Sequence, residues 1–302
     1  MKLNHQITSP RHSRHGFSLI ELLVVIVIIG ILMALILPAL NGARIRARIT
    51  QVSTEITQLD QALVSFENRF KSLPPSSLTI PTNAASWTAA DRQSILRIWD
   101  QFDFTTCGGL GSVAAGVSGE GKYPLAPIHL NGAECLVFFL GGINADLNGL
   151  GQLIGFANNS QIPWAVYPQN RDIPFFENFV PNRLVDLDGD GYREFLDSLP
   201  DQAMPYLLFS SQGKSYDKTN SATAWDAFDV HGGMMNALDM TSIYIGPDGK
   251  TPLRNQGYQI ISPGLDQAYG TGGVYTDGTE LTGPRQPEAD NITNFSGGLL
   301  KP

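Results

Sequence analysis

The sequence predicts an α+β protein in which the second half of a long N-terminal helix packs against an antiparallel β-sheet. Three observations predict this fold class. Residues 17–40 form a largely apolar stretch, and an apolar stripe with helical spacing continues beyond it to residue 70. Further along, short apolar segments bounded by turn residues have the composition of strands, around 204–211, 241–246 and 257–262.

The apolar stretch is long enough to cross a bilayer, because a helix needs about 20 apolar residues to do so. Residues 22–37 carry no charge, but Glu21 stands inside the stretch. An unpaired carboxylate in lipid costs on the order of 3 kcal/mol or more, so Glu21 needs a partner. A removable secretory signal has a similar apolar core and is the alternative interpretation of these residues.

The helix is expected to continue beyond the membrane. Apolar residues recur at alternating spacings of four and three, which places them on one face of a helix. Apart from Pro38 and Gly42, no helix-stopping signal precedes Pro74 and Pro75. We therefore expect one helix of about 55 residues, about 80 Å long, which a cleaved signal would not need. The stripe consists of Ile45, Ile49, Val52, Ile56, Leu59, Leu63, Phe66 and Phe70.

The charge of the chain is unevenly distributed. The net charge is −8, but residues 1–16 carry Lys2, Arg11 and Arg14 and no acid, which leaves −11 on residues 17–302. So acidic a body is not expected to bind nucleic acid, since phosphate contacts need a basic surface. Calcium is a more natural partner for it.

The segment Gly16-Phe17-Ser18-Leu19-Ile20-Glu21-Leu22-Leu23-Val24-Val25 resembles the prepilin cleavage and methylation motif of type IV pilins and type II secretion pseudopilins. It combines a basic leader, a glycine before phenylalanine, a glutamate as the fifth residue of the mature chain and an apolar run. The resemblance implies that a prepilin peptidase cuts after Gly16 and that the new N-terminal Phe17 is methylated. It also implies that Glu21 meets the N-terminal ammonium of a neighbouring Phe17 in a filament.

The resemblance implies a domain organisation of the pilin type. Residues 1–16 would be the leader, 17–40 the transmembrane and filament-core helix, and 41–73 the part of the same helix outside the membrane. Residues 74–302 would form the globular body, in which 76–185 would be a large insertion relative to the family core.

The implied function is that of a structural subunit of a type II secretion pseudopilus or a related type IV pilus. Its partners would be copies of itself, other pseudopilins or pilins, the prepilin peptidase and methyltransferase, the inner-membrane assembly platform and the bilayer. The chain would cross the cytoplasmic membrane once, with its N-terminus inside and its body in the periplasm or on the cell surface. The alternative is a minor or tip protein whose enlarged body binds a ligand or surface.

Catalysis by this chain is not expected. The Gly-Lys-Ser at 213–215 is not a phosphate-binding loop, because Leu208 stands where that motif needs its first glycine. His129 and His231 stand alone, and a lone histidine is more often structural or solvated than catalytic.

Two cysteines, Cys107 and Cys135, are separated by 27 residues, with no pattern typical of a zinc or redox site. One disulfide is a candidate, and closing a loop of this size would stabilise the fold by roughly 3 kcal/mol. Two separately buried thiols are the alternative, because free cysteine is commonly buried.

Residues 186–197 match the spacing of an EF-hand-type calcium loop. Three aspartates within five residues repel one another unless a cation neutralises them, and a hard oxygen cage suits Ca²⁺. The last ligand is aspartate instead of the usual glutamate, and no clear helices flank the loop. A solvated acidic turn is therefore the alternative. The expected ligands are Asp186, Asp188, Asp190, the backbone carbonyl of Tyr192, Glu194 and Asp197.

A second calcium candidate is implied only by the resemblance. Residues 201–206 look like a degraded form of a motif of the major pseudopilins, and residues 258–266 resemble that group's closing strand and turn. In that group the C-terminal loop binds a structural calcium. Carried over, its ligands would include Asp266 and Asp290.

In the middle of the chain, residues 91–102 predict a short amphipathic helix, and 134–143 form an apolar run that fits either a helix or a buried strand. Three aromatic residues, Trp87, Trp164 and Tyr167, are expected in the core rather than on a binding surface.

Overall fold

A computed structural model describes residues 18–110, 123–144, 152–166, 170–212, 216 and 243–300. The chain divides into two compact units, residues 1–47 and 48–302, and each is described here by itself.

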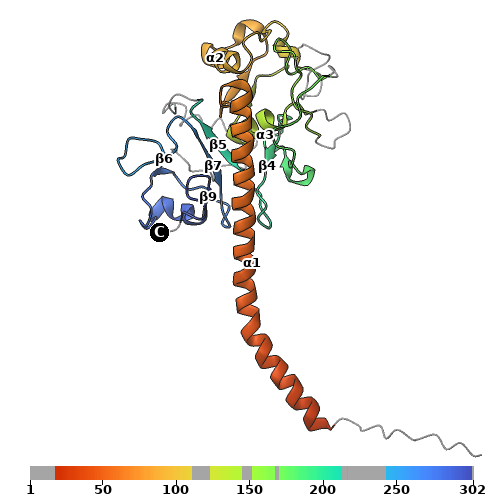
Figure 1. The fold of residues 1–302 in the computed structure, drawn as a ribbon, viewed down its shortest axis with the longest axis vertical. Coiled ribbons are helices and arrows are strands. Elements are labelled where there is room, and N and C mark those ends of the chain that lie inside the picture. Colours follow the sequence, from red (N-terminus) through yellow and green to blue (C-terminus); the bar gives the residue numbers. More distant parts are fainter. Residues whose placement is uncertain are drawn as a thin grey trace, which may run out of the picture. The chain divides into compact units, whose positions relative to one another are not determined.

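The first unit contains the N-terminal part of helix α1, which runs from Leu19 to Phe70 (Figure 1). Its apolar side chains from Leu19 to Leu37 are exposed. The most apolar window of 18 residues has a mean hydropathy of 3.2, and none of it is buried. By length and composition this part of α1 can cross a membrane, in agreement with the sequence.

The remainder of α1 belongs to the second unit and supplies one side of its core. The predicted stripe is confirmed from Val52 to Phe66, whose apolar members are at most 4 % exposed, and Ile49 and Phe70 pack partly buried against the same core. The expectation for Ile45 is wrong, because this side chain is 45 % exposed in the first unit. Packing of the stripe therefore begins about one helical turn later than the spacing predicts.

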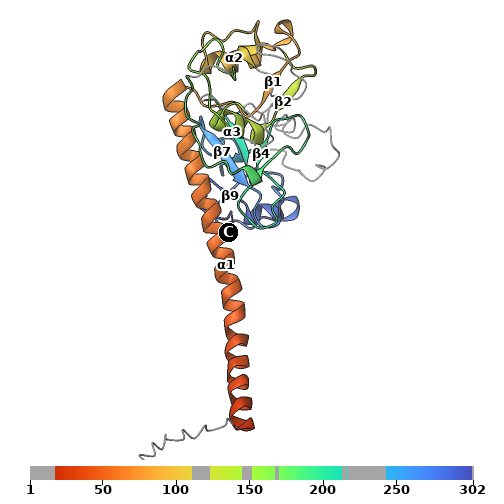
Figure 2. The same cartoon turned by 90° about the vertical axis from the view of Figure 1, so that its right-hand side faces the viewer.

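A three-stranded antiparallel sheet packs against this part of α1 (Figure 2). Its order is β5 (Leu207–Ser210), β7 (Tyr258–Ser262) and β9 (Ile292–Thr293). Because side chains alternate along a strand, Leu208 and Ile260 share the core with α1. Leu207 and Ile261 join a second cluster with the C-terminal segments.

The predicted strand at 241–246 does not join this sheet. It forms β6 (Tyr244–Ile245), which pairs in parallel with β8 (Gly273–Val274). Both edges of β7 are already occupied, by β5 and β9. Strand β6 is instead linked to β7 by the buried side chain of Gln259. The amide of this side chain accepts a hydrogen bond from the Tyr244 nitrogen and donates one to the Tyr244 oxygen.

Most of the other elements lie between α1 and β5 in sequence, and η5 lies just before β9. Strand β1 (Leu78–Ile80) pairs with β2 (Ile128–Leu130), and β3 (Leu184–Val185) pairs with β4 (Glu194–Phe195), both antiparallel. Short 3₁₀ helices are η1 (Ala84–Ser86), η2 (Cys107–Gly109), η3 (Pro181–Arg183) and η5 (Gly283–Asp290).

Two further α-helices, α2 and α3, form in the middle of the chain. Helix α2 (Ala89–Ile98) is the predicted amphipathic helix, with Ile95 and Ile98 buried. The apolar run at 134–143 is helical as far as Gly141, because α3 spans Gly132–Gly141, and all residues of α3 are buried. A capping box starts α3: the Asn131 side chain accepts from the Glu134 nitrogen, and the Glu134 carboxylate accepts from the Asn131 nitrogen, each at 2.8 Å.

The expectation for the aromatic residues is confirmed for two of the three. Trp87 and Trp164 are 6 % and 0 % exposed, and their ring centroids lie 6.4 Å apart. Tyr167 lies outside the described residues. The two cysteines, Cys107 and Cys135, are both buried free thiols, as in the alternative to a disulfide.

Candidate functional sites: the N-terminal segment and two acidic loops

The first turn of α1 contains the acid that interrupts the apolar stretch. The Glu21 Oε2 atom accepts a hydrogen bond of 2.8 Å from the Ser18 nitrogen. The first N–H groups of a helix have no partner within the helix, so a carboxylate in the first turn satisfies one of them. Glu21 thus reaches back to the residue next to the predicted mature N-terminus. Gly16 and Phe17 themselves lie outside the described residues.

The predicted EF-hand-like loop connects β3 to β4. Asp186 shapes it, since its two carboxylate oxygens accept from the Gly189 and Gly191 nitrogens at 2.7 and 3.1 Å. Both glycines have φ values that favour glycine, 84° and 94°. Asp186 therefore holds the turn with both of its oxygens.

The structure brings two of the predicted ligands together with a residue that the loop does not contain. Carboxylate oxygens of Asp188, Asp190 and Glu134 all lie within 4.8 Å of one another. Glu134 comes from the first turn of α3, and α3 packs against β4. We name the space between the carboxylates of Glu134, Asp188 and Asp190 the acidic cavity.

The other predicted ligands have different surroundings. Asp197 is turned toward the sheet, where its carboxylate accepts from the Ser262 hydroxyl at 2.5 Å and from the Leu199 nitrogen at 2.8 Å. The Tyr192 ring is buried beside Phe138, at a centroid distance of 5.8 Å. Glu194 is fully buried and accepts from the Leu187 nitrogen at 3.1 Å.

Burial and crowding raise the pKa values of these carboxyl groups. The pKa of Asp190 is raised to about 7, mainly by burial and in part by the charges of Asp188 and Asp186. The pKa of Glu194 is raised to about 8, again mainly by burial and then by Asp188 and Asp186. Burial also raises the pKa of Glu134, with the charges of Asp190 and Glu194 next in effect. These carboxyl groups are therefore costly to ionise together without a cation.

Sequence reasoning missed Glu134, because residues 134–143 were considered only as an apolar run. A signal for it was present in Asn131 and Glu134, whose spacing is that of a capping box. A glutamate at the start of a helix with no polar face has to lie in the interior. A buried carboxylate in turn needs a hydrogen-bonding or charged partner.

The second predicted calcium candidate is also assembled by the fold. The Asp290 Oδ2 atom accepts from the Leu265 and Asp266 nitrogens at 2.6 and 3.1 Å. The pKa of Asp266 is raised to about 6, mainly by burial and in part by the neighbouring Asp290 charge. The Gln202 amide donates to the Gly264 oxygen at 3.1 Å, which joins the two segments of the resemblance. Calcium binding by Asp266 and Asp290 stays a prediction.

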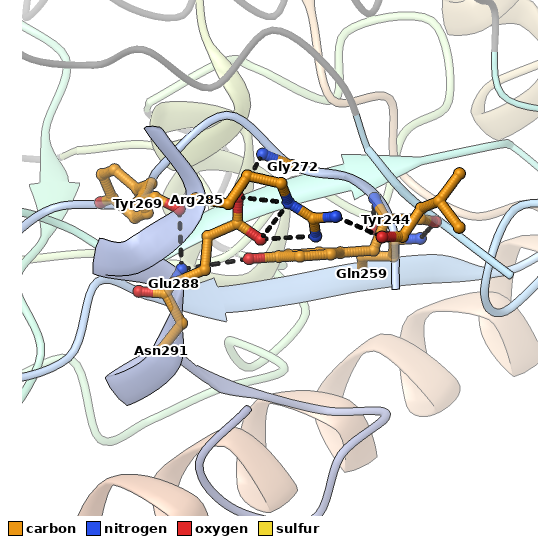
Figure 3. A network of polar contacts seen from close by, with 8 residues as sticks. Tyr244, Gln259, Tyr269, Gly272, Arg285, Glu288 and Asn291 are labelled. Atoms are coloured by element: carbon orange, nitrogen blue, oxygen red, sulfur yellow. Dashed lines mark hydrogen bonds and ion pairs between the residues drawn. The ribbon is translucent and has the colours of Figure 1, made fainter. Parts of the chain in front are cut away.

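A buried polar network holds this C-terminal loop in place (Figure 3). Glu288 is fully buried, pairs with Arg285 at 2.7 Å and accepts from the Gly272 nitrogen at 2.9 Å. Asn291 lies three residues after Glu288, and its side-chain amide donates to the Tyr269 backbone oxygen at 2.8 Å. Asp290 is therefore fixed by its neighbours in sequence on both sides.

Comparison with known proteins concerns the N-terminal segment. Residues 11–37 match the family described as the prokaryotic N-terminal methylation motif. A stretch of 53 residues is 45 % identical to the type II secretion system core protein G of Klebsiella michiganensis. This match covers 18 % of the present chain and 37 % of the relative. No solved structure matches the chain.

The two matches agree with the features of the N-terminal segment described above. The matched motif covers the predicted cleavage site, the first-turn acid Glu21 and the exposed apolar part of α1 from Leu19 to Leu37. The chain has one helix, among the described residues, that is long and apolar enough for a single membrane span. The N-terminal segment of the chain is thus similar to that of type IV pilin-like proteins, among them the pseudopilins of type II secretion.

Proposed function

We propose that this chain is a structural subunit of a type II secretion pseudopilus or a related type IV pilus. The observation that carries the proposal is the match of residues 11–37 to the methylation motif, reinforced by the 45 % identity to a type II secretion core protein. The exposed apolar part of α1 supports it, because these side chains need lipid or neighbouring helices around them.

Processing is the first part of the proposal. A prepilin peptidase removes residues 1–16 after Gly16, and the amine of Phe17 is methylated. The intact protein, extracted from membranes and examined by mass spectrometry, is expected to begin at a methylated Phe17. A chain that begins at Met1, or one cut near Ala43 as a secretory signal would be, overturns the proposal.

Glu21 has a role in assembly under this proposal. Removal of the leader creates an ammonium group at Phe17, next to the Ser18 nitrogen that Glu21 already contacts. In a filament the same carboxylate meets the ammonium of a neighbouring subunit, where a desolvated ion pair fixes the register more than it adds stability. The membrane-spanning part of α1 is first held in the inner membrane, with the body outside.

The partners follow from this assembly. They are further copies of the chain, other pseudopilins or pilins, and an inner-membrane platform that adds subunits at the base. The bilayer holds the subunits before they enter the filament.

The second candidate function is that of a minor or tip subunit whose enlarged body binds a ligand or surface. One observation favours it: the 53 matched residues are 18 % of this chain but 37 % of the relative, so this chain is about twice as long. Quantitative mass spectrometry of membranes separates the two, because a major subunit is made in large excess over its minor partners.

A further inference from the structure

We propose that the acidic cavity formed by Glu134, Asp188 and Asp190 binds one Ca²⁺ ion, which joins helix α3 to the β3–β4 loop. This inference goes beyond the proposed function and does not depend on filament assembly. It also changes the ligand set that the loop sequence alone predicts. Glu134 enters the set, only Asp188 and Asp190 of the predicted ligands remain in it, and Asp186 and Asp197 accept hydrogen bonds elsewhere.

Two of the three carboxylates, those of Glu134 and Asp190, share one arrangement. In Glu134 one oxygen accepts from the Asn131 nitrogen while Oε1 is buried without a hydrogen-bond partner. In Asp190 one oxygen accepts from the Tyr192 nitrogen while Oδ2 is buried without a partner. A buried polar atom without a partner is costly, and several that converge are the arrangement of a cation site. The backbone thus orients each group and leaves an oxygen for the ion.

Glu134 provides the observation that distinguishes this site from a surface acidic turn. Its side chain is fully buried. It also lies in the wall of a small neighbouring cavity, which is lined by Gly142, Asn144, Tyr192 and Arg193 but not by Asp188 or Asp190. The Asn144 Oδ1 atom in the same wall is buried without a partner as well. A neutral amide oxygen beside carboxylates is a usual part of a calcium coordination shell.

The spacing of the oxygens fits calcium in particular. Calcium lies 2.3–2.6 Å from its ligands, so two oxygens on opposite sides of one ion are about 5 Å apart. The three carboxylate oxygens lie within 4.8 Å of one another. Magnesium needs ligands at about 2.0–2.1 Å in strict octahedral geometry, and it keeps several of its waters. A largely buried wall offers magnesium little room for those waters.

Glu194 lies behind these ligands and increases the negative charge of the site. Its side chain is fully buried, and its Oε1 atom has no hydrogen-bond partner. Together with Asp188 and Asp190 it acts on Glu134 to raise the pKa of that group. A bound divalent cation offsets the mutual repulsion of these carboxylates.

The experiment measures calcium binding to the full chain in detergent, after removal of metal ions with a chelator. Isothermal titration with CaCl₂ and thermal unfolding with and without CaCl₂ are carried out on the wild type and on Glu134→Gln. Glutamine keeps an oxygen for the Asn131 nitrogen, so the start of α3 is retained. We expect calcium to raise the melting temperature of the wild type, and Glu134→Gln to weaken calcium binding by at least about tenfold.

Three further variants make the outcome decisive. Asp190→Asn is expected to weaken calcium binding as Glu134→Gln does, while Asp277→Asn, at an exposed site, is expected to leave it unchanged. Asp290→Asn tests the C-terminal loop. The proposal is wrong if calcium does not bind the wild type, or if binding survives both Glu134→Gln and Asp190→Asn. It is also wrong if only Asp290→Asn removes the binding.

Discussion

Arg183 and Glu55 form a two-pronged ion pair that joins helix α1 to the start of β3. The two terminal guanidinium nitrogens of Arg183 each donate to a different carboxylate oxygen of Glu55, both at 2.7 Å. The Tyr206 hydroxyl donates to the same carboxylate at 2.6 Å, and the guanidinium lies over the Phe195 ring at 4.2 Å. This pair fixes which turn of α1 faces β4 and β5.

Replacement of Glu55 by glutamine is expected to destabilise the protein by about 2–3 kcal/mol. The side chains of Arg183 and Glu55 are only 18 % and 14 % exposed, and removing one charge leaves the other largely buried and unpaired. Urea unfolding of the detergent-solubilised protein measures the effect. The control is Arg69→Gln, which removes the more exposed pair with Asp172 and is expected to cost at most about 1 kcal/mol. Equal losses of stability in the two variants would contradict the expectation that the less exposed Glu55–Arg183 pair contributes more than the Arg69–Asp172 pair.

Gly142→Ala is expected to destabilise the fold by about 2–4 kcal/mol. Gly142 ends α3 with φ of 85°, and an added Cβ would lie 2.2 Å from the Gly155 Cα, which is backbone and cannot turn aside. The control is Gly278→Ala, where φ is 79° but no atom lies within 4 Å of an added Cβ. Backbone strain alone is expected to cost about 1 kcal/mol there. Thermal unfolding of the two variants separates the contact from the strain.

Glu21→Ala is expected to leave membrane insertion intact and to impair filament assembly. A neutral side chain is easier to keep in lipid, but it cannot pair with an ammonium group. Membrane fractionation measures insertion, and shearing followed by immunoblotting measures filaments. Wild-type amounts of filament from this variant would contradict the proposed role of Glu21 in assembly.

The two cysteines are expected to resist alkylation in the folded protein. Cys107 and Cys135 are free and buried, and burial raises the pKa of the Cys107 thiol, so its reactive thiolate is scarce. Treatment with iodoacetamide without a reductant should label neither cysteine in the native protein and both in guanidinium chloride. Mass spectrometry counts the labels. If labelling of the unfolded protein also requires a reductant, the two cysteines are bonded.

The local patterns predicted much of this fold. The 3–4 spacing of apolar residues placed the buried stripe of α1 correctly from Val52 onward, because helical spacing and burial are directly connected. Strands β5 and β7 were also found where apolar residues cluster. The pairing of β6 could not be predicted, because it depends on the side chain of Gln259, which bonds to Tyr244 across the core.

The acidic cavity could be predicted only in part from local sequence patterns. Asp188 and Asp190 were predicted from their spacing in one loop, but Glu134 precedes them by more than fifty residues. Only the packing of α3 against β4 brings the three together. Asp197, by contrast, has the spacing of a loop ligand, yet β7 captures its carboxylate through Ser262. The spacing of residues along the chain does not show that another side chain, here Ser262, will bind a predicted ligand.

The position of β9 near the end of the chain has a consequence for biosynthesis. Leu63 and Ile292 lie in the same core, and both are fully buried. At about 5–20 residues per second, the ribosome makes Ile292 on the order of ten to fifty seconds after Leu63. Throughout this interval the apolar stripe of α1 lacks part of its covering, and non-local pairing is slow to form in any case. We therefore expect a nascent chain of this protein to be a substrate for chaperones until β9 has emerged.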